Sequence, residues 1–492
     1  MKKHLLILLL FGMISSQAQD SFISVLKDST EDIPFSIKQI GSNFFLAQRY
    51  SLEESGSWRQ ARISKLNASG KLISTYSYPL LGYLNTGLSL IYPLNNSDFL
   101  VIGGCRLENM PFAQLWVMKM DTSLNVIWDK KFMTNQPYTS NKAITENPEG
   151  ILVIGSALTT GSPSHLYSLF FLEITKDGDS IKSNYLTNGD PSSADIQSFI
   201  FISGQYKAFV DGFDAFTTNN CYTQILQLDT SLNLIEVRST PLWIDSYLTA
   251  EKIDNGRYFL TGMAYSSLNH YDITIGKFDT NEDTLLYNHT GSPGAVPDYS
   301  AWKQCMTISN NNSIYTGGTT NDNSLFYTCN SNYMKKFMLS NYDSLLNCRW
   351  TYFYGCDTAC LTLSTIEATS DGGCIMAGMY YNPDYPENML DVIVIKVDSI
   401  GLITGLPDNK TITTHQAIVY PNPGQDYIVI QSGPQIAHSE FRLYNTSGQL
   451  VRHTNLNNTN EQSDVSSLPS GVYPWQIIHQ GKTIEQGKWV KP

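Results

Sequence analysis

The sequence predicts an all-β protein: a seven-bladed β-propeller followed by a small Ig-like β-sandwich. Three observations favour this class. A unit of 50 to 64 residues recurs along most of the chain, two independent markers identify each copy, and the sequence changes character after residue 416. One four-stranded sheet cannot bury both of its faces, whereas sheets stacked radially bury one another and leave only short edges. The alternative for the repeat region is a pair of β-sandwiches with chance periodicity.

The two markers count the same number of copies. The first is the glycine that closes the second apolar strand, at Gly103, Gly155, Gly212, Gly262, Gly317 and Gly378, with Gln48 in its place in the earliest copy. The second is the polar residue that ends the third strand, at Asn67, Asp121, Thr175, Asp229, Asp279, Asp343 and Asp398. A glycine tolerates positive φ and close backbone approach, and an Asp can bond its own downstream backbone in an Asx-type turn. Both series therefore indicate seven blades.

Each copy divides into four short strands rich in β-branched and aromatic residues. In the second copy they are Ser89–Pro93, Asp98–Gly104, Leu115–Met120 and Leu124–Phe132. The last copy is short of its outer strand, because only Leu402–Leu406 precede Pro407. We therefore expect the upstream apolar segment Phe22–Leu26 to supply a strand to the last blade and to close the ring.

The N-terminus is typical of a secretory signal peptide, residues 1–18. A basic start, Lys2-Lys3-His4, precedes an apolar core, Leu5–Ile14, and small residues around Ala18 suit cleavage. This core is too short for a stable membrane anchor, and no later run approaches spanning length, so we expect no transmembrane segment. The expected domains are the propeller at 21–407, a linker at 408–416 and the sandwich at 417–492.

Composition excludes some functions. The net charge is −12 without a basic stripe, so we expect no nucleic-acid partner. Export permits disulfides among the eight cysteines. From local spacing we expect Cys356–Cys360 and Cys329–Cys348, with Cys105 and Cys221 as candidates for buried free thiols. Neither Cys-x2-Cys spacing nor nearby His indicates zinc, and we expect no metal and no cofactor.

The search for catalytic motifs finds no metalloprotease, nucleophile-elbow, P-loop or EF-hand pattern. One pair of carboxylates stands out. Glu251 and Glu367 each lie eleven residues before the marker glycine of their copy, which predicts equivalent places on innermost strands. Facing the channel, two carboxylates could split their pKa values and act as acid and base on a glycosidic bond. The alternative is that both are solvated strand-end residues.

A second candidate is the loop at residues 380–388 of the last copy. Tyr380, Tyr381 and Tyr385 are accompanied there by Pro, Asn and Asp. Flat aromatic faces beside polar acceptors suit the binding of a sugar or a peptide. The alternative is that the tyrosines pack against a neighbouring loop.

The repeat resembles propeller-type repeats of large secreted proteins from Bacteroidetes-type bacteria. The last copy carries the resemblance best, through Thr369-Ser370-Asp371-Gly372-Gly373, Ala377-Gly378 and the run from Ile395 to Gly401. The other copies match loosely. The resemblance covers about three quarters of the chain and implies a fold without implying an activity.

The C-terminal region resembles the type A sorting domain of the type IX secretion system. Four blocks carry the resemblance in order: Tyr420-Pro421-Asn422-Pro423, Leu443-Tyr444-Asn445 with Gly448–Val451, Leu468–Tyr473 with Gly471, and Lys488–Lys491. The expected strands are Tyr427–Gln431, Glu440–Asn445, Gln449–His453, Gly471–His479 and Thr483–Val490. The alternative is an ordinary accessory sandwich.

This resemblance implies that the secretion machinery is a partner and that the protein is secreted, at the cell surface or in the medium. It also makes Asp-Ser/Thr-apolar triplets such as Asp398-Ser399-Ile400 similar to O-glycosylation sites, although such pairs are also good turn formers. The leading function is non-catalytic binding of a glycan or protein ligand, or a structural role. The alternative is a glycan-active hydrolase or lyase that uses the channel carboxylates.

Overall fold

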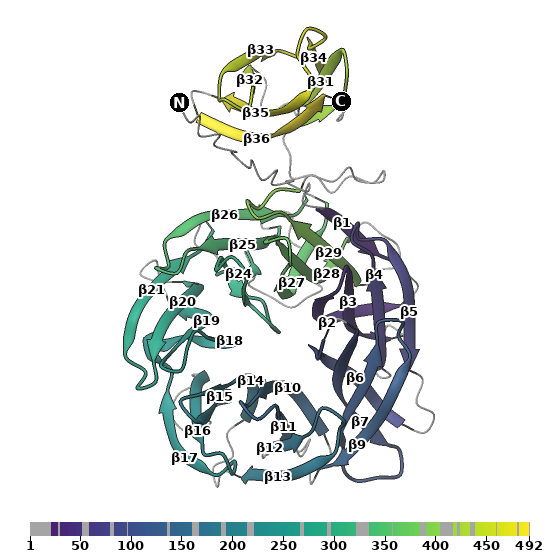
Figure 1. The fold of residues 1–492 in the computed structure, drawn as a ribbon, viewed down its shortest axis with the longest axis vertical. Coiled ribbons are helices and arrows are strands. Elements are labelled where there is room, and N and C mark those ends of the chain that lie inside the picture. Colours follow the sequence, from purple (N-terminus) through teal and green to yellow (C-terminus); the bar gives the residue numbers. More distant parts are fainter. Residues whose placement is uncertain are drawn as a thin grey trace, which may run out of the picture.

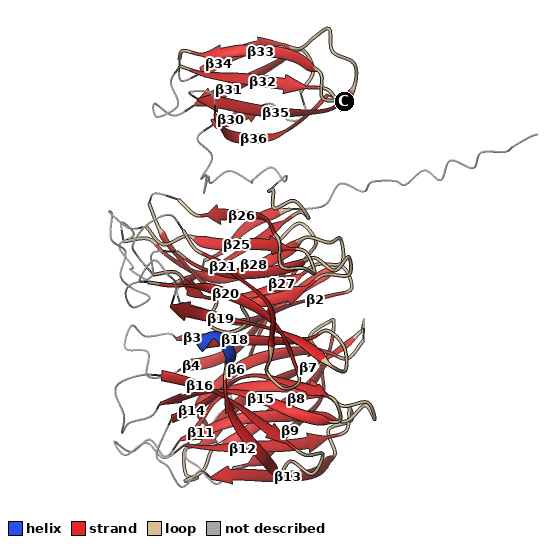
Figure 2. Ribbon diagram, turned by 90° about the vertical axis from the view of Figure 1, so that its left-hand side faces the viewer, coloured by secondary structure: helices blue, strands red, loops and turns tan. Residues whose placement is uncertain are grey.

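The computed structural model describes most of the chain. The described residues are 21–27, 30–51, 59–78, 83–95, 97–134, 138–159, 167–187, 193–213, 221–265, 270–292, 297–320, 334–356, 358–383, 390–403, 417–420, 424–432, 438–458, 460–479 and 482–491. The predicted signal peptide and the predicted boundary near residue 407 therefore lie outside this set. Within it, the protein is almost entirely β-strand (Figure 2), with one 3-10 turn at Pro241–Trp243.

Seven antiparallel sheets stand around a common centre, which confirms the predicted seven-bladed propeller (Figure 1). Blades one to three comprise β2 (Glu31–Ile40), β3 (Asn43–Ser51), β4 (Arg59–Leu66) and β5 (Leu72–Tyr78); β6 (Tyr83–Pro93), β7 (Asp98–Leu107), β8 (Gln114–Asp121) and β9 (Val126–Met133); and β10 (Tyr138–Glu146), β11 (Leu152–Thr159), β12 (Tyr167–Ile174) and β13 (Ser180–Thr187). Blades four and five comprise β14 (Ser193–Ile202), β15 (Gln205–Phe213), β16 (Cys221–Leu228) and β17 (Leu234–Ser239); and β18 (Asp245–Lys252), β19 (Arg257–Tyr265), β20 (Tyr271–Asp279) and β21 (Thr284–Thr290).

Blade six has a divided inner strand, and blade seven is completed from the other end of the chain. Blade six comprises β22 (Tyr299–Ser300), β23 (Met306–Ile308), β24 (Ile314–Thr319), β25 (Phe337–Tyr342) and β26 (Cys348–Tyr354). Blade seven comprises β27 (Cys360–Ala368), β28 (Cys374–Tyr381), β29 (Asp391–Val397) and, outermost, β1 (Phe22–Leu26). β1 pairs antiparallel with β29 from Phe22↔Lys396 to Leu26↔Val392, which confirms the predicted ring closure.

Close approach explains four of the marker glycines, Gly103, Gly155, Gly317 and Gly378. None of them has positive φ, so that part of our explanation was wrong. A Cβ on Gly378 would lie 2.2 Å from the carbonyl oxygen of Thr362 and 2.6 Å from the Phe337 ring of blade six. A side chain at this place would therefore push neighbouring blades apart. In blade four the strand register puts Val210, and not Gly212, at the equivalent place.

The polar marker at the end of the third strand forms the predicted Asx-type turn. Asp229 is representative: its Oδ1 accepts hydrogen bonds from the backbone N–H groups of Ser231 and Asn233, both at 2.8 Å. These bonds, with one from the Asn233 side-chain amide, hold the pKa of the Asp229 carboxyl below its usual value. The fourth residue of the turn, Leu232, has a φ of 65° and packs its side chain into the core. The turn therefore ties a surface loop to the blade interior.

The same turn is a docking point for the preceding blade. Its carbonyl oxygens accept hydrogen bonds from side chains of that blade: Lys65 Nζ to Thr122, Lys182 Nζ to Thr230, Lys207 Nζ to Thr280, Asn288 Nδ2 to Leu346 and Tyr354 OH to Gly401, at 2.6 to 3.0 Å. Because a carbonyl oxygen has two lone pairs, it can bond across blades without breaking the turn. The repeated turn thus explains part of the cohesion between blades.

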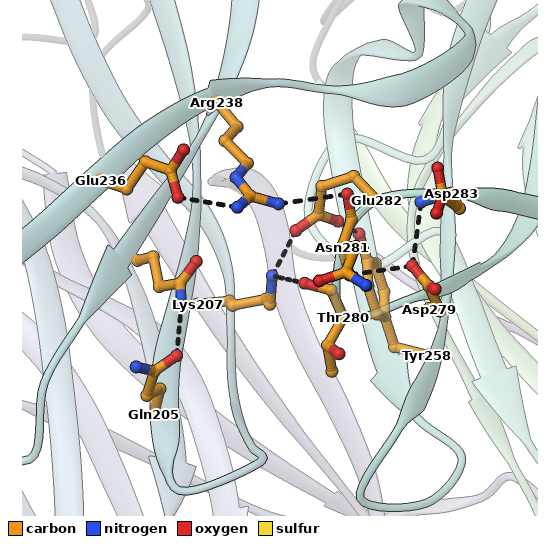
Figure 3. A network of polar contacts seen from close by, with 11 residues as sticks. Gln205, Lys207, Glu236, Arg238, Tyr258, Asp279, Thr280, Asn281, Glu282 and Asp283 are labelled. Carbon is orange, nitrogen blue, oxygen red and sulfur yellow. Dashed lines mark hydrogen bonds and ion pairs between the residues drawn. The ribbon is translucent and has the colours of Figure 1, made fainter.

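Blades four and five show the most extensive contact of this kind (Figure 3). Lys207 on β15 is 2% exposed and pairs with Glu282 in the blade-five turn. Tyr258 also donates a hydrogen bond to Glu282, and burial beside this carboxylate raises the pKa of the phenol. Arg238 on β17 donates to the carbonyl oxygen of Asn281 at 3.1 Å.

Replacing Lys207 with Met should destabilise the propeller strongly. A buried carboxylate that loses its partner is left uncompensated, which costs about 3–5 kcal/mol of unfolding free energy. Lys65→Met is the matched control, because Lys65 makes the same kind of turn contact from a partly exposed side chain and is in no ion pair among the described residues; it should cost about 1 kcal/mol. Chemical denaturation would measure both variants. Equal effects would show that the Lys207–Glu282 pair has no special role.

The two predicted disulfides are wrong. Cys356 is a buried free thiol in the core shared by blades six and seven, where its sulfur lies 3.8 Å from the carbonyl oxygen of Ala359. Cys360 is in a disulfide with a cysteine whose side chain lies outside the described residues. A short sequence separation therefore did not bring Cys356 and Cys360 together, because one sulfur packs inward.

Cys348 is an exposed free thiol, so it does not pair with Cys329, which lies outside the described residues. Cys105 is confirmed as a buried free thiol, and burial raises its pKa to about 12.

The C-terminal region folds as two sheets around its own core. One sheet contains β30 (Ala417–Tyr420), β31 (Tyr427–Ser432) and β34 (Asn460–Asp464); the other contains β33 (Leu450–Leu456), β32 (Ser439–Tyr444), β35 (Gly471–His479) and β36 (Lys482–Lys491). Alternate residues of β32, such as Phe441 and Leu443, meet Trp475 and Trp489 in the core. This arrangement confirms the predicted small β domain and adds β30 and β34 to the expected strands.

Candidate functional site in the propeller channel

The innermost strands of the blades carry bulges at one common level. The register skips one residue at Phe35 in β2, Ser89 in β6, Gln197 in β14 and Ser364 in β27. A β-bulge leaves its extra residue out of the ladder and re-aims that side chain. These strands surround the centre of the ring (Figure 1), so the bulges select which side chains reach the channel.

A small pocket lies at this level. Five blades contribute to its wall. The lining residues are Phe35, Ser36, Ser89, Leu90, Lys142, Ile196, Gln197, Lys303 and Gln304. Three of them are the bulge residues Phe35, Ser89 and Gln197. The space inside holds about two or three water molecules, which is too small for a sugar ring.

The pocket wall is cationic and aromatic. Lys142 is 7% exposed. The Lys303 ammonium lies 4.9 Å from the centre of the Phe35 ring and 4.3 Å from that of the Trp302 ring. Arg49 places its guanidinium 4.3 Å from the same Phe35 ring. No Asp or Glu is among the lining residues, although the whole chain is acidic.

The predicted carboxylates belong to a neighbouring group on the innermost strands. Glu367 forms an ion pair with Lys38 of blade one, Nζ to Oε2 at 2.5 Å. Lys38 also donates to Gln304 Oε1 at 3.1 Å, and Gln304 Nε2 lies 3.4 Å from Glu367 Oε2. Blades one, six and seven therefore converge on Glu367, and protein partners hold Oε2 of its carboxylate.

Glu251 is near this group and has a perturbed pKa. Enclosure by the surrounding blades removes much of its solvation and raises its pKa to about 7. The positive charge of Lys38 lowers this pKa, whereas the negative charge of Glu367 raises it further. Chemically, Glu251 can keep its proton near neutral pH, as the acid of an acid and base pair must. The structure thus brings Glu251 and Glu367 together, as the sequence pattern suggested.

The raised pKa of Glu251 predicts a pH dependence of stability. The folded state holds this proton more tightly than the unfolded chain, whose glutamates titrate near 4.5. The stabilisation is complete below pH 4.5 and is lost as the pH rises through about 7. The melting temperature of the wild type should therefore fall more between pH 5 and pH 8 than that of Glu251→Gln. Glu149→Gln, at an exposed turn, should keep the wild-type profile; identical profiles for all three proteins would contradict the assignment.

The predicted aromatic site is not assembled as expected. Tyr380 is buried in the core of blade seven, with the Lys27 ammonium 5.1 Å from its ring centre. It packs inside the blade because its strand position faces blade six, so the prediction that it offers a face to a ligand is wrong. Tyr381 is partly exposed at the end of β28, and Tyr385 lies outside the described residues.

Sequence reasoning missed the basic residues of the channel. Glu251, Glu367 and Lys38 stand opposite Phe259, Ile375 and Phe45, each three residues before the marker of its blade. Comparing paired residues would thus have identified Lys38. No local signal identifies Lys142 or Lys303, because irregular inner strands bring them to the pocket. Among the described residues, no group of three or more metal-ligating side chains occurs.

The sorting-motif residues gather at one end of the C-terminal domain. Gly471 pairs with Lys491 across β35 and β36. Tyr473 donates a hydrogen bond to the Pro469 carbonyl oxygen at 2.6 Å, and Lys491 Nζ donates to the carbonyl oxygens of Val465 and Ser466. Gly448 has a φ of 77° in an Asx-type turn, and Lys488 pairs with Pro474. Tyr420 ends β30, and Pro421, Asn422 and Pro423 lie outside the described residues.

Comparison with protein families decides what this domain is. Residues 418–491 match the model of the secretion system C-terminal sorting domain. This region is a type IX sorting domain. The sorting-domain protein is therefore secreted to the cell surface or the extracellular space, and the domain interacts with the type IX machinery. No helix among the described residues is long and apolar enough to cross a membrane.

The propeller of this sorting-domain protein has similar solved structures at low identity. Polysaccharide lyase Uly1 is 10% identical, with a TM-score of 0.43, over 74% of this chain and 89% of that one. A protein of unknown function from Dyadobacter fermentans is 10% identical, with a TM-score of 0.43, over 77% and 98%. PorZ, a surface component of the type IX secretion system of Porphyromonas gingivalis, is 11% identical, with a TM-score of 0.25, over 93% and 75%.

No curated protein matches this sequence. The structural similarities are too weak to carry a functional argument, so the function has to be argued from the channel itself.

Proposed function

We propose that this exported propeller is a non-catalytic binding protein whose ligand is a surface or extracellular glycan or protein. The observation that carries the proposal is the environment of Glu367. A catalytic base or nucleophile must present a carboxylate oxygen to its substrate. Here Lys38 and Gln304 hold Oε2 of Glu367, and the channel pocket beside it has space for about two or three water molecules, which leaves no room for a sugar ring.

The cationic and aromatic wall supports binding. Phe35 and Trp302 have ring centres 5.1 Å apart and lie beside Lys303 and Arg49. Phe35 is only 3% exposed, so its ring serves to hold the neighbouring cations in place, and donors held in this way can bind a ligand without reacting with it. The ring of blades supplies a rigid frame, since the channel residues come from several blades at once.

A glycan-active enzyme is the second candidate function. It is favoured by one observation: Glu251, with a pKa near 7, lies near Glu367, which Lys38 keeps paired with a positive charge. A glycoside hydrolase needs one carboxyl group that keeps its proton near neutral pH, so that it can protonate the leaving oxygen.

One experiment separates the two candidates. The mature protein is incubated with a panel of neutral and acidic polysaccharides, and both retention in affinity electrophoresis and new chain ends are measured. Retention without new chain ends is the expected result. New chain ends that disappear in the Glu251→Gln, Glu367→Gln double variant would overturn the proposal in favour of the enzyme. A lack of retention, together with capture of a protein from the outer-membrane fraction, would identify a protein ligand.

A further inference from the structure

We infer that the channel pocket between the bulged inner strands is a binding site for a small oxyanion, a carboxylate, sulfate or phosphate group. The inference deepens the proposed binding function, on which it rests, by assigning the chemistry of the recognised group. It stands on three features of the pocket: its cations, an unpartnered buried hydroxyl and its size.

The first feature is the charge of the wall. Lys142 and Lys303 come from blades three and six, and both line the pocket without an accompanying Asp or Glu. Lys142 is 93% buried, since only 7% of its surface is exposed. Two ammonium groups on one wall make the pocket electropositive. An oxyanion bound there would form charge-assisted hydrogen bonds, which are the stronger kind.

The acidity of the whole chain strengthens this point. A net charge of −12 disfavours the approach of anions to the surface in general. The cations near the channel therefore do not reflect a basic protein. Lys38 pairs with Glu367, and Lys142 and Lys303 line the pocket.

The second feature is Ser89, the bulge residue of blade two. Its side chain is 7% exposed and lines the pocket, and its Oγ has no hydrogen-bond partner. A buried hydroxyl without a partner costs about 1–3 kcal/mol. Its equivalent in blade seven, Ser364, accepts a hydrogen bond from Trp302 Nε1 at 2.6 Å. A ligand oxygen in the pocket would give Ser89 the partner that Ser364 finds within the protein.

Further donors surround the same space. Ser36 Oγ accepts the backbone N–H of Ile91 at 3.2 Å, which leaves its O–H bond as a donor. The bulge residue Gln197 contributes a side-chain amide to the wall. Ammonium, hydroxyl and amide N–H groups are all donors, and oxyanions offer only acceptors.

The third feature is the size of the pocket. Space for about two or three water molecules suits a carboxylate or a tetrahedral oxyanion and excludes a sugar ring or a nucleoside. The group can be a free ion, or a substituent of an acidic polysaccharide whose backbone stays outside the pocket. Both sources share the same chemistry.

The test uses the full secreted chain in a dilute chloride buffer. Isothermal titration calorimetry is done with sodium sulfate, sodium phosphate and sodium acetate, and with sodium chloride at matched ionic strength. A second set uses a sulfated oligosaccharide, a uronic-acid oligosaccharide and a neutral oligosaccharide. We expect saturable binding of at least one oxyanion with a Kd of about 1 mM or lower. Saturation matters, because sulfate also stabilises proteins by exclusion from their surface, without saturation.

Three variants give the proposal its specificity. Lys142→Met keeps the length of the side chain and should weaken oxyanion binding about tenfold or more. Ser89→Ala should keep the fold and weaken oxyanion binding about three- to tenfold. Lys252→Met removes an exposed lysine from β18 and should leave oxyanion binding unchanged. If Lys142→Met is not folded by circular dichroism, Ser89→Ala decides alone.

The outcomes separate the two proposals. An absence of saturable oxyanion binding, or binding that is equal in Ser89→Ala and the wild type, would overturn the oxyanion site. If polysaccharides are retained equally by the wild type and the pocket variants, the oxyanion site would be overturned, whereas the proposed binding function would remain supported. Oxyanion binding without any polysaccharide binding would support the site and reject the glycan as its source.

Discussion

Deletion of residues 21–30 is expected to lower the melting temperature of the mature propeller by about 10 °C. These residues contain β1, which forms the outer edge of blade seven. Phe22 is buried against residues of both blade seven and blade one, including Phe44 at a ring-centre distance of 5.8 Å. Loss of this aromatic ring alone costs about 3–5 kcal/mol, and the unpaired edge of β29 becomes open to association with other chains.

Differential scanning calorimetry of three proteins tests this expectation. Phe22→Ala should reproduce a large part of the loss, whereas Ser24→Ala, on the same strand, should change little because it keeps every backbone pair. Size-exclusion chromatography should show association of the deletion variant. An unchanged melting temperature would mean that the ring is closed without β1.

Truncation of the last strand, residues 482–492, is expected to abolish secretion almost completely. β36 pairs with β35 from Gly471↔Lys491 to His479↔Lys482, and it carries the fully buried Trp489. A sandwich of this size loses much of its core with that strand. This domain interacts with the type IX machinery. A protein whose sorting domain is unfolded should therefore remain in the periplasm.

Immunoblots of periplasmic, surface and medium fractions measure this effect in the native host. Trp489→Ala should reduce secretion severely, since its indole packs against Tyr473 at a ring-centre distance of 5.8 Å. Lys491→Ala removes only hydrogen bonds to two carbonyl oxygens at the end of the domain and should be milder. Normal surface levels of the truncated protein would show that another part of the chain directs export.

The fold was predictable because its signals are local and repeated. The Asp at the end of each third strand acts within five residues, so its turn could be derived from residue type alone. The strand count of blade seven was also predictable, since an outer strand was missing at one end of the repeat region and an apolar segment was unused at the other. The glycine marker was located correctly in most blades, but its cause, close approach between blades, depends on neighbours about 15 to 60 residues away.

The candidate site was predictable only in part. Glu251 and Glu367 were found by counting from a marker, which works where the inner strands are regular. Lys142, Lys303 and Ser89 were missed because bulges shift the register, and a one-residue shift changes the side to which a side chain points. The disulfide predictions were wrong for a related reason, because sequence spacing does not show in which direction the sulfur of a cysteine points.

The sequence by itself determined the class of the protein, the number of blades, the closing strand and the C-terminal sorting domain. Each of these depends on periodicity, on turn chemistry or on motifs whose residues are near one another in the chain. The tertiary structure alone decided which side chains meet in the channel, that Glu367 is paired with Lys38, and that a cationic pocket surrounds the hydroxyl of Ser89. Those contacts join residues from five or more blades, and their energies arise from burial and charge, which no single stretch of sequence contains.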